Sequence, residues 1–309
     1  MPSPTAPVIR ADGVTVRFGA LTALSAVDVT VTARATGLLG ANGAGKSTLM
    51  KCLLGLIRPA AGSLSVLGVE VADGAWDLRR RLGYMPERGC LPRDMTARDF
   101  VVHMGELRGL DHRTAVLRAS EVLFQVGLEE ERSRLIGTFS TGMTQRTKLA
   151  QALVHSPDLV ILDEPTNGLD PAGREEMLTL VRRLSRELDI AVLMSSHVLE
   201  DITRTCDAVV VLRDGTVAHD GPIDDLRDGV AEGGLRVVLG GDVDRVAALL
   251  TARGLGVTPG AAGELAVTGA APDALADAIR DALADAGASL HALRPAGRTI
   301  EEALVEVLS

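Results

Sequence analysis

The chain of 309 residues has few aromatic side chains and no excess of basic charge. It contains one Trp, one Tyr and four Phe, and its formal net charge is −9. Proteins that bind nucleic acids usually combine a basic surface with aromatic side chains that stack on bases. The composition therefore argues against direct binding to nucleic acid.

Long hydrophobic runs are also missing. The longest apolar runs, such as residues 159–162 and 190–194, are far shorter than the roughly 18 residues that a membrane-spanning helix needs. The N-terminal sequence MPSPTAPVIRADG lacks the basic start and the apolar stretch of a secretory signal. We therefore predict a chain without a transmembrane segment that works in the cytoplasm.

Cysteine is scarce as well. Cys52, Cys90 and Cys206 are odd in number and widely separated. This pattern fits neither a disulfide framework nor a metal site with closely spaced ligands. We interpret all three as ordinary thiols.

The first two thirds of the chain alternate between apolar, β-branched runs and segments of helical periodicity. This alternation predicts an α/β domain whose sheet is largely parallel in its centre and is covered by helices on both faces. Residues 88–155 differ, because their periodicity is helical and contains no convincing strand. We expect them to form a helical subdomain. The predicted strands lie near residues 14, 64, 159, 191 and 208.

A second, smaller domain is expected after a linker. Over residues 219–234 the apolar pattern stops and Gly and Asp accumulate. The remaining segments follow the order β-α-β-β-α-β, which is typical of a ferredoxin-like unit, and a last helix is predicted from about residue 299. We therefore expect two domains, 1–222 and 223–309, the second of the α+β class.

Residues 40–48, GANGAGKST, match the pattern G-x-x-x-x-G-K-[ST] of a phosphate-binding loop. A strand-like segment precedes the loop and a helix-like segment follows it, as this motif requires. Glycines let successive backbone N–H groups point at one anion, and the helix that begins near Lys46 adds its positive dipole. The loop predicts polyphosphate binding by Gly40, Asn42, Gly43, Ala44, Gly45, Lys46, Ser47 and Thr48.

Lys46 is one of only three lysines in a chain with 32 basic residues. Its ammonium is a compact point charge that fits inside a narrow ring of backbone N–H groups, whereas the planar fork of arginine is broad. We predict that Lys46 neutralises the β- and γ-phosphates and that the Ser47 hydroxyl binds Mg²⁺. The alternative is a glycine-rich turn that only caps a helix.

An apolar strand, residues 159–162, ends in Asp163 and Glu164. Carboxylates at the C-terminal edge of a parallel strand lie where α/β sheets bind their ligands. We predict that Asp163 reaches the metal ion and that Glu164 is the general base for an attacking water. Two solvated acids in a turn before Pro165 are the alternative.

Residues 138–157, TFSTGMTQRTKLAQALVHSP, place Ser140 and Gly142 just before a strong helical pattern. A hydroxyl and free N–H groups at a helix N-terminus form a second anion site, which the nucleotide on the phosphate loop could not easily occupy as well. With these motifs, residues 8–222 resemble the ATP-binding subunit of ABC transporters, whose LSGGQ signature lies shortly before an acidic pair.

The resemblance implies a P-loop NTPase fold, ATP and Mg²⁺ as cofactors, and a head-to-tail homodimer with two composite sites. Each ATP would lie between the phosphate loop of one subunit and Ser140 and Gly142 of the other. The D-loop corresponds to Gly168, Leu169 and Asp170, and His197 to the histidine that senses the γ-phosphate. Phe18 matches the aromatic residue that stacks on adenine. A structural histidine and a core phenylalanine are the simpler alternatives.

Three positions depart from the family pattern. Thr141 replaces the first glycine of the signature, and Met143 replaces its glutamine. A positive φ would cost threonine about 1–2 kcal/mol, so we predict an ordinary backbone at Thr141. Glu87, in GYMPERG, replaces the glutamine of the Q-loop; an ionised carboxylate only accepts hydrogen bonds, and it could approach Mg²⁺ or water. These variants are similar to drug-exporter ATPases of the ABC-2 type.

The leading hypothesis is an ATPase that energises export of an unidentified substrate through a separate transmembrane permease, on the inner face of the cell membrane. The helical segment and the Glu87 region would form the docking groove. A soluble ABC-type module that clamps nucleic acid or ribosomes is a second hypothesis, and the acidic charge argues against it. A P-loop kinase is a third, and it leaves Ser140 and His197 unexplained.

The end of the chain, TIEEALVEVLS, resembles the C-terminal extension of exporter ATPases. A stabilising or dimerising appendage is the alternative interpretation of the second domain.

Overall fold

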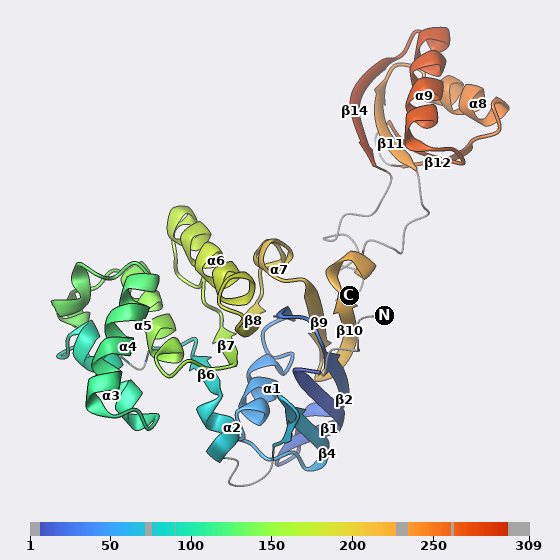
Figure 1. Cartoon of the computed structure of the whole chain (residues 1–309). Coiled ribbons are helices and arrows are strands. Elements are labelled where there is room, and N and C mark those ends of the chain that lie inside the picture. Colours follow the sequence, from blue (N-terminus) through green and yellow to red (C-terminus); the bar gives the residue numbers. More distant parts are fainter. Residues whose placement is uncertain (1–6, 72–75, 90, 227–233, 261–262, 296–309) are drawn as a thin grey trace, which may run out of the picture. The chain divides into compact units, whose positions relative to one another are not determined.

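The computed structural model (Figure 1) describes residues 7–71, 76–89, 91–226, 234–260 and 263–295. The chain divides into two units, one that ends at Ile223 and one that begins at Asp224. The first unit contains two sheets and most of the helices, and the second is a small α+β unit.

The first unit is built on a six-stranded sheet of order β10-β9-β3-β8-β7-β6. Its five strands from β9 to β6 are mutually parallel and β10 is antiparallel to β9, which confirms the predicted parallel centre. Every residue of β3, β7 and β8 is buried, as expected for strands covered on both faces. The bounds are β3 Ala35–Leu39, β6 Leu82–Met85, β7 Leu159–Asp163, β8 Ala191–Ser196, β9 Ala208–Arg213 and β10 Thr216–Pro222.

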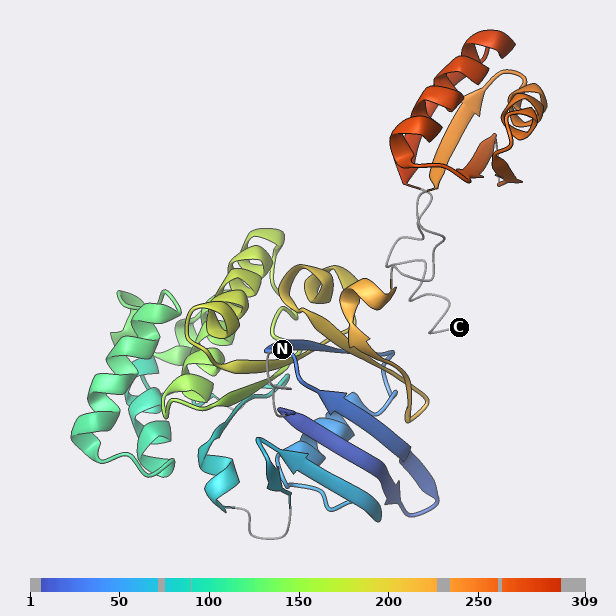
Figure 2. The same ribbon diagram turned by 45° about the vertical axis from the view of Figure 1, so that its right-hand side comes forward.

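A separate antiparallel sheet of order β2-β1-β4-β5 lies beside helix α1 (Figure 2). Its apolar side chains form one buried core with those of α1, among them Leu24, Leu64 and Met50. The sequence predicted β1 and β4 but not β2. The bounds are β1 Ile9–Phe18, β2 Leu21–Val31, β4 Ala61–Val66, β5 Val69–Glu70 and α1 Lys46–Leu53.

Four of the remaining helices in the described part of the first unit begin at a side-chain cap. Side chains of Thr96, Asp111, Ser140 and Asp170 each accept a hydrogen bond from a backbone N–H in the first turn of α3, α4, α5 and α6. Between residues 88 and 155 the described elements are helices, short 3₁₀ turns and one isolated bridge, Thr96 to Leu135. The bounds are α2 Trp76–Arg80, α3 Ala97–Leu107, α4 His112–Gln125, α5 Thr141–Leu153, α6 Pro171–Arg186 and α7 Leu199–Thr205.

Helix α5 is attached by its side chains and C-terminal turn to β6, the last strand of the six-stranded sheet. Two side chains of the helix and the histidine just after it donate to backbone carbonyls of β6 and of the two residues that follow this strand. Lys148 donates to the carbonyls of Pro86 (2.8 Å) and Glu87 (2.7 Å), Gln151 to Tyr84 (2.6 Å) and His155 to Leu82 (3.0 Å). The edge of the sheet is therefore satisfied by a helix instead of by another strand.

The prediction of a linker over residues 219–234 was wrong at its beginning. Residues 219–222 belong to β10, which pairs with β9, and Ile223–Leu226 form a 3₁₀ turn. As an edge strand with alternating exposure, β10 needs few apolar residues, so its sequence resembles a loop. Residues 227–233 lie outside the described residues.

The second unit has the element order β-α-β-β-α-β that the sequence predicted. Its sheet has the order β12-β13-β11-β14, and every neighbouring pair is antiparallel. Apolar residues of β11 and β13 pack against both helices in one core. The predicted last helix lies outside the described residues. The bounds are β11 Leu235–Gly240, α8 Val243–Ala252, β12 Gly256–Pro259, β13 Glu264–Thr268, α9 Pro272–Ala286 and β14 Ser289–Pro295.

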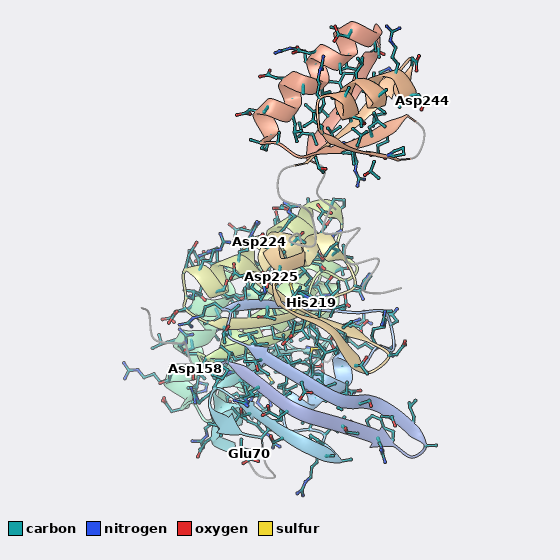
Figure 3. All side chains as sticks on the ribbon, turned by 90° about the vertical axis from the view of Figure 1, so that its right-hand side faces the viewer. Glu70, Asp158, His219, Asp224, Asp225 and Asp244 are labelled. Atoms are coloured by element: carbon teal, nitrogen blue, oxygen red, sulfur yellow. The ribbon has the colours of Figure 1, made fainter. Side chains whose placement is uncertain are left out.

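Acidic side chains are found on the outside of both units. Glu70, Asp158 and Asp244, which Figure 3 labels, are all exposed. Within the described part of the chain, every helix is too short or too polar to cross a membrane.

Candidate functional site

The phosphate-binding motif forms the turn between β3 and α1. Gly45 has a φ of 105°, and a Cβ atom there would lie 2.7 Å from Leu24 Cδ2 and 2.9 Å from the Ala23 carbonyl. At Gly40 a Cβ atom would lie 2.5 Å from the Leu212 carbonyl oxygen. The loop can take this path only with glycine at both positions.

Lys46 is the first residue of α1 and is 8% exposed. Its ammonium donates to the carbonyl of Gly40 at 2.6 Å and to that of Ala41 at 3.3 Å. The positive charge is therefore held inside the loop whose N–H groups would cradle an anion, and Lys46 also lines the adjoining cavity.

Asp163 and Glu164 lie at the C-terminal end of β7, next to the loop. Asp163 is 6% exposed and accepts a hydrogen bond from the Ser195 hydroxyl at 2.8 Å. Burial raises the pKa of Asp163, and the nearby carboxylates of Glu87 and Glu164 raise it further, whereas the Ser195 hydrogen bond lowers it. Three acidic side chains, Asp163, Glu164 and Glu87, are therefore close enough at this edge of the sheet to influence one another.

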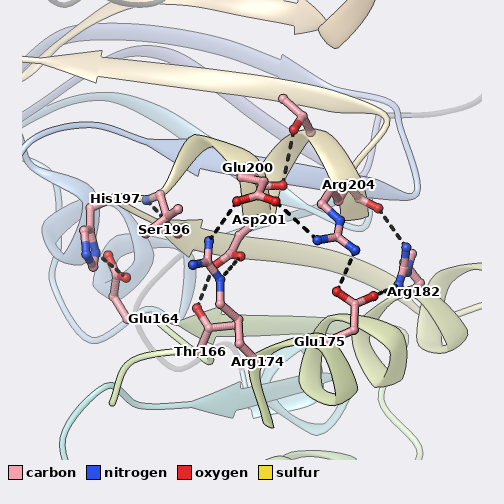
Figure 4. Close-up of polar contacts among 12 residues, drawn as sticks. Glu164, Thr166, Arg174, Glu175, Arg182, Ser196, His197, Glu200, Asp201 and Arg204 are labelled. Carbon is pink, nitrogen blue, oxygen red and sulfur yellow. Dashed lines mark hydrogen bonds and ion pairs between the residues drawn. The ribbon is translucent and has the colours of Figure 1, made fainter. Parts of the chain in front are cut away.

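Glu164 contacts the histidine that follows β8. Its Oε2 lies 2.8 Å from His197 Nδ1, and its side chain is 9% exposed while that of His197 is 55% exposed (Figure 4). The contact is a hydrogen bond when Nδ1 carries the proton. A buried carboxylate is therefore oriented by an imidazole that remains open to solvent.

These groups share one cavity of about 570 Å³. The cavity brings together most of the predicted site: Phe18, Asn42, Gly43, Gly45, Lys46, Ser47, Thr48, Glu87, Asp163, Glu164 and His197. Gly40 and Ala44 belong to the same loop but do not line the cavity. Phe18, at the end of β1, is 49% exposed.

Ser140, Gly142 and Asp170 lie elsewhere, around a second cavity of about 560 Å³ that shares no lining residue with the first. Ser140 caps α5, and its hydroxyl accepts the Met143 N–H at 3.3 Å. Thr141 is the first residue of this helix and has no positive φ, as predicted. The free N–H groups of the first turn of α5 therefore open onto a cavity of their own.

Several cavity residues escaped the sequence analysis. Asp214 and Gly215, with φ of 48° and 78°, form the turn between β9 and β10 and line the first cavity. An Asp-Gly pair between two apolar runs signals a hairpin, but not which cavity the hairpin reaches. Asn167 also lines this cavity and donates to Glu87 Oε1 at 3.4 Å.

A polar network connects the helices that follow the cavity residues (Figure 4). Asp201, on α7, is fully buried and accepts from Arg174 Nε at 2.6 Å and from Thr166 Oγ1 at 2.7 Å. Arg174 lies on α6, whose N-cap is Asp170. The network therefore connects the segment after Glu164, helix α6 and helix α7.

The oxygen donors on the cavity wall suit a small divalent cation. Asp163 and Ser47 both line it, and carboxylate and hydroxyl oxygens are ligands that Mg²⁺ prefers. Among the described residues, no three His, Cys, Asp or Glu side chains are placed to hold a metal ion by themselves. A cation here would complete its coordination with water or with oxygens of a phosphate bound to the adjacent loop.

A phosphate loop between a central parallel strand and a helix, with carboxylates at the end of a neighbouring strand, defines a P-loop NTPase. Residues 24–167 match the family model described as "ABC transporter". The chain is 40% identical over 191 residues to the bacitracin transport ATP-binding protein BcrA of Bacillus licheniformis, covering 62% of this chain and 61% of BcrA. The chain thus spans about three fifths of the length of this relative.

Two further comparisons cover more of the matched protein. The daunorubicin resistance ATP-binding protein DrrA3 of Streptomyces coeruleorubidus is 36% identical over 253 residues, covering 81% of this chain and 79% of DrrA3. A solved ATP-binding subunit of an ABC transporter is 31% identical, with a TM-score of 0.64 over 72% of this chain and 92% of that structure. The chain belongs to the family of ABC transporter ATP-binding proteins.

Proposed function

We propose that this chain hydrolyses ATP to drive transport through a separate membrane permease. The observation that carries the proposal is the first cavity, where the phosphate loop meets Asp163, Glu164 and His197. Hydrolysis of a nucleoside triphosphate requires a cradle for the phosphates, positive charge beside them and a base that activates water. All three requirements have a candidate residue in this cavity.

Each residue has a definite task in this mechanism. The loop N–H groups and Lys46 bind the phosphates, and Phe18 stacks on the adenine ring. Glu164, held by His197, takes the proton of the attacking water. Ser47 and Asp163 would hold Mg²⁺, with Glu87 on the same cavity wall, and the ion would supply charge neutralisation at the phosphates. The buried position of Glu164 keeps the base away from bulk solvent.

We also propose that two copies pair head to tail. In one copy the Ser140 cavity is separate from the phosphate-loop cavity, so a nucleotide on the loop leaves the α5 N-terminus without an anion. In the pair, Ser140 and Gly142 of the partner subunit would face the bound triphosphate and Asp170 would lie close by. A two-fold axis would give two such sites.

The permease would hold the pair at the inner face of the membrane. Leu107, Leu117 and Phe124, on α3 and α4, are 66%, 59% and 64% exposed, and in this proposal they contact the permease. Bacitracin and daunorubicin in the names of the relatives support a transporter of the drug-export type. Co-purification of a polytopic partner with the tagged chain from detergent-solubilised membranes tests this part, and a chain recovered only from the soluble fraction would contradict it.

Glu164→Gln tests the catalytic assignment. Glutamine preserves the size of the side chain but cannot take a proton, so phosphate release should fall about 10²- to 10⁴-fold while MgATP binding is retained. The variant should accumulate as an ATP-bound dimer, measured by light scattering after size-exclusion chromatography. Glu187→Gln changes an acid on the surface of the same unit and should behave as the wild type. Unchanged hydrolysis in Glu164→Gln would refute the assignment.

A further inference from the structure

Ser195 lies beside the two acidic residues of the site but does not line the cavity. It is the fifth residue of β8, and its position in the sheet is directly opposite Asp163 of β7. Its exposure is 0%. Any effect of this side chain on a bound nucleotide therefore has to act through its neighbours.

The Ser195 hydroxyl makes two hydrogen bonds at once. It donates to Asp163 Oδ1 at 2.8 Å and accepts the backbone N–H of Glu164 at 2.9 Å. A hydroxyl has one hydrogen and two lone pairs, so both bonds are compatible. Since a carboxylate oxygen only accepts, the hydrogen has to point at Asp163, and the lone pairs are left for Glu164.

The backbone of Glu164 needs such support. Its φ is 49°, in the left-handed region that is unfavourable for a residue with a Cβ atom. The Ser195 hydroxyl holds the N–H of Glu164, and the Asn167 N–H donates to the Glu164 carbonyl at 3.1 Å. The direction of the Cα–Cβ bond depends on this conformation. The direction of this bond in turn determines whether the Glu164 carboxylate reaches His197.

We propose that Ser195 is a positioning residue for hydrolysis of the nucleotide. It keeps the Glu164 backbone left-handed, so that the carboxylate faces His197, and its hydrogen bond to Asp163 orients the hydroxyl for this task. This proposal rests on the proposed function, because it assigns Ser195 a part in the ATPase reaction. Strain of this kind persists at functional sites where the surrounding structure enforces it.

Ser195→Ala removes both hydrogen bonds without removing a side chain that lines the cavity. We expect kcat for ATP hydrolysis to fall roughly 10- to 100-fold, the range that a misplacement of about 1 Å produces, while KM for ATP changes less than about threefold. Ser185→Ala is the control. Ser185 is also buried, at 9% exposure, and its hydroxyl donates only to the Arg182 carbonyl on α6. This control should retain wild-type kcat.

A double-mutant cycle distinguishes positioning from general destabilisation. If Ser195 acts through the Glu164 carboxylate, adding Ser195→Ala to Glu164→Gln should change the residual rate less than about twofold. Ser195→Thr retains the hydroxyl and should restore at least about a third of the wild-type kcat. If the extra methyl group of threonine prevents Ser195→Thr from folding, the double-mutant cycle by itself tests whether Ser195 acts through Glu164.

Two results would overturn the proposal: wild-type kcat in Ser195→Ala, or equal losses of rate on the wild-type and Glu164→Gln backgrounds. An inactive wild-type chain would instead contradict the proposed function itself, so the two failures are distinguishable.

Discussion

Replacing Asp201 by alanine should destabilise the first unit severely. The Asp201 carboxylate is fully buried and accepts two hydrogen bonds. One comes from the charged guanidinium of Arg174 and the other from the hydroxyl of Thr166. A hydrogen bond to a charged group contributes about 1.5–3 kcal/mol, and removing one partner of a buried pair costs more because the other charge is stranded. The side chain of Arg174 is 30% exposed, so water can partly solvate the guanidinium.

With that discount, we expect the free energy of unfolding to fall by about 3 kcal/mol. For a unit of this size the loss corresponds to a Tm lower by roughly 6–12 °C. Urea unfolding followed by tryptophan fluorescence measures it, because Trp76 is the only tryptophan and belongs to the first unit. The signal is therefore not mixed with unfolding of the second unit.

Glu200→Ala is the matched control. Glu200 precedes Asp201 on the same helix and contacts the same arginine, but its distance to Arg174 Nη2 is 4.0 Å and its side chain is 60% exposed. Exposed ion pairs contribute about 0–1 kcal/mol, so this variant should lose less than about 1 kcal/mol. If Asp201→Ala loses no more than Glu200→Ala, burial does not set the strength of this network and the reasoning is wrong.

Three further predictions follow from the cavities and from α5. Lys46→Ala should raise the Kd for MgATP roughly 30- to 5000-fold, measured by calorimetry, since truncating one partner of a buried charge pair costs about 2–5 kcal/mol; retained affinity would contradict its role. Ser140→Arg should leave ATP binding by single subunits intact but abolish the ATP-dependent dimer in light scattering, and a normal dimer would exclude Ser140 from the interface. Burial, together with the positive charge of Arg108, lowers the pKa of His155 from 6.5 to about 4. The unfolded chain therefore binds a proton in a range where the folded chain does not, so the free energy of unfolding should fall by up to roughly 3 kcal/mol as the pH drops from about 6.5 to about 4. His155→Gln should reduce this slope in urea titrations at pH 7 and pH 5, and an identical slope would refute the assignment.

The sequence predicted those parts of the site that are encoded by contiguous residues. The loop from Gly40 to Thr48, the pair Asp163 and Glu164, and the helix start at Ser140 each follow from local spacing and from the element next to them. The parallel centre of the sheet was predicted from strands that are apolar at every position. Such strands are typical of a parallel sheet that is covered by helices on both faces.

The parts that were missed depend on contacts between distant segments. Ser195 bonds to Asp163 and Glu164, 32 and 31 residues away, and Asp201 bonds to Thr166, 35 residues away. A serine in a buried strand or an acid on a helix has no local signature of such a role. Strands β2 and β10 were missed because half-exposed strands carry polar residues at alternate positions.

The attachment of α5 to β6 has a consequence for solubility. The last strand of an open sheet presents unpaired carbonyls, and these can recruit a strand from another molecule and start aggregation. Here Lys148, Gln151 and His155 occupy the carbonyls on that side. The fold thereby blocks further growth of the sheet with a helix, and β6 itself needs no proline or charged side chain for protection.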